Sequence, residues 1–314
     1  MKYPALVLAL SLQLLTSGGT LAPVDATEVK KRALLGVCTR DSLQQEPYSK
    51  WFNKNYEAYT PNSEVTAQLG AATENLQIKV FFGSWCSDSK RELPRLLKVL
   101  DAISFPSENL SLIAVSNVDS MKRQSPDGEE LGQEIFRVPV IIVQQDGVEI
   151  SRIVEHPVLS LERDLLAIVS HQDYTPNYAS YVLLSQWLTA GLLSDENVST
   201  RGLAKQIDRL VSSEGELNTA GEVLRGRGQL QEAVKVYEVN VALFPKSARR
   251  RQALAKVLQE AEDYAYAERT LKRAAQLNDN PDKLKDILEL LEEVQEQLRE
   301  QEAASEAAKS DDET

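Results

Sequence analysis

The sequence has few of the residues that most often carry metal or nucleophilic chemistry. It contains two cysteines and two histidines, and His156 and His171 do not have the spacing to the cysteines that a zinc site needs. It also lacks a phosphate loop, a dinucleotide-binding fingerprint and a serine-hydrolase elbow. We therefore expect no metal and no cofactor, so that any site chemistry falls to Cys38 and Cys86.

Basic character and long apolar runs are also scarce. The net charge of −12 argues against nucleic acid or anionic lipid as a partner. The one apolar run, residues 5–15, follows Lys2 and precedes small residues, which is typical of a secretory signal peptide cleaved after Ala22 or Ala26. An uncleaved anchor is the alternative, but the run is shorter than the ~20 residues that span a membrane. We expect an exported, periplasmic protein that loses residues 1–26 and does not associate with membranes afterwards.

One stretch places a cysteine between a strand and a helix. Residues 76–82 are apolar and aromatic, as in a buried strand, and the leucines of residues 93–100 recur at helical spacing. Cys86 therefore falls where the helix begins, beside free backbone amides and the positive end of the helix dipole. Both favour a nucleophilic thiolate. Asp88 in the first turn opposes this effect, and we expect the nearer amides to prevail.

The same stretch resembles the active-site segment of the thioredoxin family. Trp85 and Cys86 match the motif, and Pro94 matches the proline of the helix that follows it. Ser89 stands in place of the second, resolving cysteine, so the motif is Cys-x-x-Ser. Val80 stands where many thioredoxins have a buried aspartate that deprotonates that second cysteine, so the two departures agree chemically.

A second segment carries the same resemblance. Residues 137–150 are similar to the family's cis-proline strand, hairpin turn and edge strand, with Val138 and Pro139 at the cis position. The resemblance covers residues 60–172, about a third of the chain. It implies an α/β thioredoxin-like domain at residues 63–172, a central mixed sheet flanked by helices.

The resemblance also implies a reaction. Cys86 would form a mixed disulfide with a protein client or a redox partner, and Ser89 would donate a hydrogen bond to the thiolate. Without a second cysteine in the motif, the mixed disulfide would persist until another thiol resolves it. Trp85, Val138 and Pro139 would bind the substrate beside the sulfur. The competing hypothesis is an inert Cys86 in a scaffold that only binds proteins.

Cys38 has three interpretations that the sequence leaves open. It resolves the mixed disulfide on Cys86, it forms a stable disulfide with Cys86, or it is an unpaired thiol. A disulfide would close a long loop and stabilise the fold by roughly 4 kcal/mol, but it would also consume the nucleophile. The surrounding residues 27–62 are predicted to be an extension whose aromatic side chains pack on the core, with an aromatic binding surface as the alternative.

From residue 173 onward the pattern is helical. Residues 173–300 are predicted to form an all-α domain, and positions within 214–281 resemble a tetratricopeptide repeat in two copies, the second imperfect. The matching positions, 34 residues apart, are Gly221, Leu224, Gly228, Ala233, Tyr237 and Pro245, then Ala255, Leu258, Glu262, Ala267, Leu271 and Asp279. Such repeats imply docking of a protein partner. Residues 301–314 are predicted to be an acidic, disordered tail.

Overall fold

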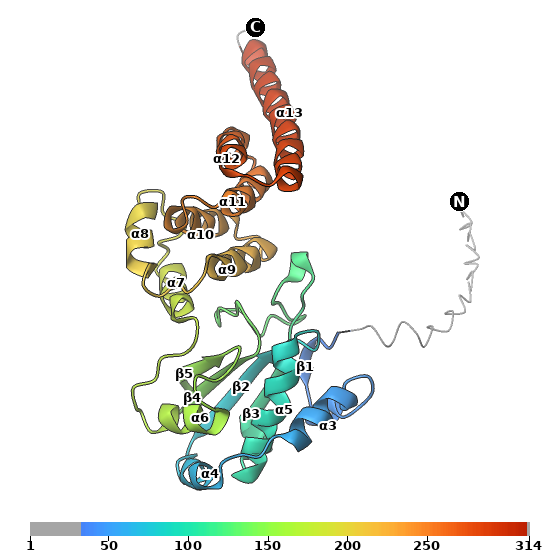
Figure 1. Cartoon of the computed structure of the whole chain (residues 1–314), viewed down its shortest axis with the longest axis vertical. Helices are drawn as coiled ribbons and strands as arrows, with labels where there is room; N and C mark the ends of the chain where they lie inside the picture. The colour runs from blue at the N-terminus through green and yellow to red at the C-terminus, as the bar shows by residue number, and fades with distance from the viewer. Residues whose placement is uncertain (1–32, 313–314) are drawn as a thin grey trace, which may run out of the picture. The chain divides into compact units, whose positions relative to one another are not determined.

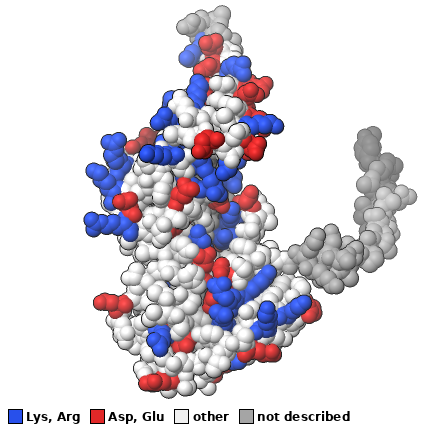
Figure 2. Space-filling model, viewed as in Figure 1, with Lys and Arg blue, Asp and Glu red and all other residues white. Residues whose placement is uncertain are grey.

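The computed structural model describes residues 33–312 (Figure 1). The predicted signal peptide, residues 1–26, lies outside the described residues. Within residues 33–312 no helix combines the length and the apolar character that crossing a membrane requires. The face of the molecule drawn in Figure 2 carries Lys and Arg side chains interspersed with Asp and Glu.

The N-terminal half is built on a mixed sheet of five strands, in the order β1-β3-β2-β4-β5. β2 and β3 are parallel, and the other neighbours are antiparallel. The α/β class predicted from the sequence is therefore confirmed. The strands are β1 (Gly36–Cys38), β2 (Leu76–Phe82), β3 (Leu110–Ala114), β4 (Val140–Gln145) and β5 (Val148–Val154).

The segment predicted as an N-terminal extension also contributes to the sheet. β1 pairs with β3 and forms one edge of the sheet, opposite β5. Its three residues are too few to show an alternating pattern, so this strand could not be predicted from the sequence. After the short helix α2 (Arg40–Leu43), Phe52 buries its ring in the core and stacks on Tyr56.

On one face of the sheet, which we call the first face, the side chains share a hydrophobic core with four helices. The leucines at helical spacing in the segment after Cys86 are buried here, as their pattern predicted. Ile78, Val80 and Phe82 of β2 point into the same core. The helices are α3 (Ser49–Ala58), α4 (Ser63–Gly70), α5 (Ser87–Ala102) and α6 (Leu161–Val169).

The second face of the sheet is covered by the C-terminal half of the chain. Phe81 and Val140 face this side and belong to one continuous core with Phe136 and with helix α7 (Ala179–Thr189). The rings of Phe136 and Tyr181 are 5.1 Å apart. The parts predicted as separate domains at residues 63–172 and 173–300 thus share a hydrophobic core. Neither face of the sheet is left to solvent.

The remaining helices form an array in which consecutive helices pack on one another from residue 214 onward, and the helix before it packs on the second of these. Two helix pairs fall where the two repeat copies were predicted. Gly221 allows the first pair to approach closely, since a Cβ atom there would lie 2.7 Å from the Tyr237 ring. The helices are α8 (Thr200–Ile207), α9 (Glu214–Gly226), α10 (Leu230–Leu243), α11 (Ala248–Glu260), α12 (Tyr264–Leu277) and α13 (Pro281–Asp312).

Helix α13 corrects the prediction for the tail. We expected disorder from residue 301, but the helix continues to Asp312. The segment 301–308 consists of Ala and Glu with one Gln and one Ser, and Ala and Glu have high helix propensity. The last part of the helix extends from a packed anchor, because Ile287 and Val294 are buried against the array. Acidic composition alone was therefore a poor guide.

Candidate functional site

Cys86 is the residue that caps the N-terminus of α5. Its backbone is extended, its carbonyl accepts the first helical hydrogen bond from the Lys90 amide at 3.0 Å, and its own amide donates to the Gly83 carbonyl at 2.9 Å. The side chain is half-buried. This is the position that the strand–turn–helix pattern predicted. The free backbone amides of the first turn of α5 follow directly after Cys86.

The structure brings Cys86 next to Val138 and Pro139. The Cys86 thiol donates a hydrogen bond to the Val138 carbonyl, with 3.3 Å between Sγ and O. The peptide bond between Val138 and Pro139 is cis, as the resemblance implies. Pro139 leads directly into β4, so the carbonyl beside the sulfur is held by the sheet. Three of the residues predicted for the site are thus neighbours.

Trp85 is held against the turn that precedes the helix. Its indole Nε1 donates to the carbonyl of Val115, just past the end of β3, at 2.9 Å. The ring lies so close to Gly83 that a Cβ atom on Gly83 would approach the indole carbons to 2.5 Å. The turn therefore requires glycine at this position, and the Trp85 ring is fixed beside the cysteine.

Ser89 lies one turn along α5 and is fully buried. Its hydroxyl accepts a hydrogen bond from the Gly83 amide at 3.1 Å. This bond ties the helix to the turn that carries Cys86. From the sequence we predicted that Ser89 would donate a hydrogen bond to the Cys86 thiolate. In the described structure its hydroxyl instead stabilises the turn, through the bond from Gly83.

Cys38 is held away from Cys86. Both cysteines are free thiols, and they face opposite sides of the sheet, because Cys38 packs on the core beneath α5 whereas Cys86 packs on the core shared with α7. The Cys38 thiol donates to the Gly36 carbonyl at 3.4 Å. Burial raises the pKa of Cys38. Its side chain is therefore held as the thiol, which is less nucleophilic than the thiolate. Of the three interpretations, the unpaired thiol matches this geometry.

Arg123 is a residue at the site that the sequence did not single out. Its guanidinium lies over the Trp85 ring, 4.6 Å from the centroid, and its Nη1 donates to Asn117 Oδ1 at 2.9 Å. The Nε atom is buried and has no hydrogen-bond partner in the described structure. Burial lowers the pKa of Arg123, and the negative charge of a Cys86 thiolate counteracts that effect. A cation is thus held close to the cysteine.

The loop that carries Arg123 also contacts helix α9. Lys122 forms an ion pair with Glu222 at 2.5 Å, and the Gln124 side chain donates to the Gly226 carbonyl at 2.8 Å. Because these contacts are polar and distant in sequence, no periodic pattern could reveal them. The loop links the Cys86 site to the helical array.

Within residues 33–312 no hydrogen bond joins a histidine to Cys86. His156 is exposed and its Nδ1 contacts the Asn177 side chain at 3.0 Å. Over residues 33–312 no group of three His, Cys, Asp or Glu side chains is arranged to hold a metal ion.

Comparison with protein-family models, with curated proteins and with solved structures found no match to this chain. The assignment of a function therefore depends on the geometry around Cys86.

Proposed function

We propose that this chain is an exported, thioredoxin-like protein that performs monothiol thiol–disulfide exchange on protein substrates through Cys86. The helical repeats would dock the client or a partner protein. One observation carries the proposal: a half-buried thiol caps helix α5 and lies 3.3 Å from the Val138 carbonyl, just before strand β4. An inert structural cysteine has no need of a helix end or of an adjacent main-chain edge.

The reaction begins with proton loss from Cys86. The thiolate attacks one sulfur of a client disulfide, the client's S–S bond breaks, and a new S–S bond joins Cys86 to the client while the second client sulfur leaves as a thiolate. No electrons are gained or lost overall. Ser89 cannot attack sulfur, and Cys38 lies on the other side of the sheet. An external thiol must therefore release the client.

The test uses the chain from residue 27 onward with Cys38→Ser, so that Cys86 is the only thiol. The protein is incubated with glutathione disulfide, and the mixed disulfide is followed by intact mass. We expect a single adduct on Cys86 that persists until dithiothreitol is added. Cys86→Ser in the same background is the control and should form none. The absence of an adduct at neutral pH would refute exchange.

A second candidate is a protein-binding scaffold with an unreactive Cys86. The arrangement of Arg123 favours it, because the guanidinium covers the Trp85 ring next to the sulfur and its loop is fastened to α9. A client would have to displace this loop or approach past it.

Ser89→Cys separates the two functions. It places a second sulfur one helical turn from Cys86, so a reactive site would release its own mixed disulfide. If exchange occurs, this variant should show dithiol reductase activity and a shorter-lived adduct. The matched change Ser87→Cys puts a thiol on the exposed side of the first turn. This thiol should release the mixed disulfide on Cys86 more slowly. If neither variant reacts, the scaffold function is the one that remains.

A further inference from the structure

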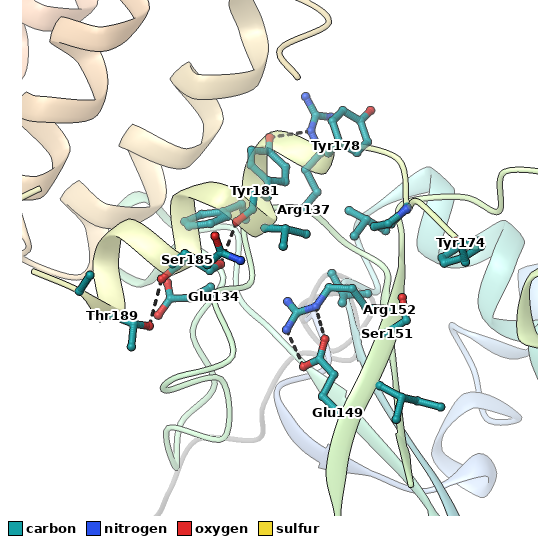
Figure 3. Close-up of a pocket in the computed structure, with 18 residues that line it drawn as sticks. Glu134, Arg137, Glu149, Ser151, Arg152, Tyr174, Tyr178, Tyr181, Ser185 and Thr189 are labelled. Atoms are coloured by element: carbon teal, nitrogen blue, oxygen red, sulfur yellow. Dashed lines mark hydrogen bonds and ion pairs between the residues drawn. The ribbon is translucent and has the colours of Figure 1, made fainter. Parts of the chain in front are cut away.

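A groove lies along the free edge of β5, away from Cys86. Its cavity of about 670 Å³ is lined by the consecutive residues Glu149, Ile150, Ser151 and Arg152. Because β5 is the outer strand of the sheet, this stretch lies along the sheet's edge. It includes an irregularity at which β5 has one residue more than β4, between the pairs Val143–Ser151 and Gln144–Glu149. Helix α7 forms the opposite wall and contributes Tyr181 and Ser185 to the lining (Figure 3).

The edge of β5 offers unused main-chain groups to this groove. The Glu155 amide donates to the Pro139 carbonyl at 2.7 Å, which makes that pair a hydrogen-bonded one. Pairs alternate along an antiparallel ladder, so Arg152 and Val154 are non-hydrogen-bonded positions, whose N–H and C=O point away from β4. The Val154 carbonyl accepts a hydrogen bond from the His156 amide. The Arg152 amide and carbonyl and the Val154 amide therefore face outward on a strand with no outer neighbour in the described sheet.

The charged side chains of the groove need no charged ligand. Arg152 makes a two-armed contact with Glu149, at 2.6 and 2.7 Å. Arg137 pairs with Glu155 at 2.9 Å, and Glu134 is held by Arg227 at 3.2 Å. Every charged residue that lines the cavity is thus in an ion pair, and a ligand that brings a net charge would find no free counter-charge.

Most of the hydroxyl groups of the groove also have a hydrogen-bond partner. Tyr181 donates to the Glu216 carbonyl at 3.0 Å, Ser185 to the Tyr181 carbonyl at 2.9 Å, and Tyr178 to Glu155. Burial raises the pKa of Tyr178 to about 12, so it stays neutral. The lining also holds the polar side chains of Ser151 and Gln186 and apolar side chains that include Val182, which is 43% exposed. The strand edge therefore adds main-chain donors and an acceptor to a groove whose charged groups are already paired.

We propose that the groove between β5 and α7 binds an extended, uncharged segment of a partner polypeptide, which pairs with the outer edge of β5. Main-chain hydrogen bonds to Arg152 and Val154 would hold the segment. Every second side chain of the segment would enter the groove between β5 and α7. The segment would be without charge, because every charged side chain that lines the cavity is already in an ion pair. This site is independent of the thiol chemistry at Cys86.

The test probes the full chain with an array of uncharged, acetylated and amidated octapeptides that alternate apolar and hydroxyl residues. Each has a partner peptide with alternate amides N-methylated, which removes the donors of one strand edge. We expect a subset to bind and its N-methylated partners not to bind. In hydrogen exchange, bound peptide should protect the Arg152 and Val154 amides, whereas the Ile153 amide, already bonded to β4, should not change.

Two matched variants locate the site. Val182→Glu places a charge in the groove and should weaken binding about tenfold or more. Leu288→Glu makes the same change on α13 at a side chain that is also 43% exposed, and it should leave binding unaltered. The proposal is overturned if no peptide binds, if N-methylation has no effect, or if both variants bind equally. Concentration-dependent dimerisation that protects the same amides would also overturn it, in favour of a second copy.

Discussion

Replacing Gly226 by alanine should loosen the loop that lies over the Cys86 site. Gly226 is the last residue of α9, and a Cβ atom there would lie 2.5 Å from the Asp119 carbonyl oxygen and 3.3 Å from Lys122 Cβ. The Asp119 atom belongs to the main chain, so it cannot rotate aside as a flexible side chain would. The loop carrying Arg123 must therefore move away from the helix.

Two opposing effects set the magnitude. Gly226 does not need a left-handed backbone, so helix propensity alone would favour alanine by about 0.5–1 kcal/mol, and by less at a helix end. Overpacking a tight contact costs about 1–3 kcal/mol. We expect a net destabilisation of the contact by about 1–2 kcal/mol. Gly215→Ala, in the same helix, is the control, because its Cβ would meet nothing closer than Ser213 Oγ at 3.8 Å.

Hydrogen exchange measures this contact locally. The Ser116 and Arg123 amides close the base of the loop, through bonds of 2.9 Å to the Gln124 and Ser116 carbonyls. In Gly226→Ala they should exchange about tenfold faster, which corresponds to about 1.4 kcal/mol. In Gly215→Ala they should exchange as in the parent protein. Unchanged exchange in Gly226→Ala would refute the close contact between the loop and α9.

Three further outcomes are expected. In the native protein iodoacetamide should label Cys86 before Cys38, because burial raises the pKa of Cys38; peptide mass mapping would contradict this if Cys38 reacted first. Burial alone would raise the pKa of Glu162, but hydrogen bonds from Tyr59 and the Asn62 amide lower it, so its stabilising effect is present above about pH 4.3 and lost as the pH falls below that. In urea unfolding, the free energy of unfolding of Glu162→Gln should therefore fall less between pH 5 and pH 3 than that of the parent protein. An equal fall in the two proteins would contradict this prediction. A chain ending at residue 172 should be insoluble or molten, since it exposes the sheet face that α7 covers; a sharp, native-like NMR spectrum would contradict that.

The sequence predicted local structure well where one pattern decided it. Residues 76–100 show a buried strand, a turn and a leucine-faced helix, and the structure has β2 and α5 there. The N-cap position of Cys86 followed from this pattern alone. The approach of Val138 depended on the resemblance, because residues separated by half of a domain meet only through the sheet register.

What the sequence could not predict was cooperation between distant segments. Arg123 belongs to a polar stretch without periodicity, yet it stacks on Trp85. The apolar residues of the second sheet face gave no indication that α7 would cover them rather than a helix of the α/β part. Both features arise from tertiary contacts, where charge pairing and surface burial override local propensity.

Access to Cys86, more than its reactivity, separates the two proposed functions. The loop over Trp85 is held by one cation–π contact, one partly buried ion pair and one side-chain hydrogen bond. Such contacts together stabilise a closed loop by an amount on the order of 2–4 kcal/mol. Opening against that free energy would slow exchange by roughly 30- to 10³-fold, since about 1.4 kcal/mol is a factor of ten. The loop alone would therefore slow the reaction without preventing it. A Cys86 that still failed to react in Gly226→Ala would be inert for a reason in its own surroundings, which is what the scaffold function requires.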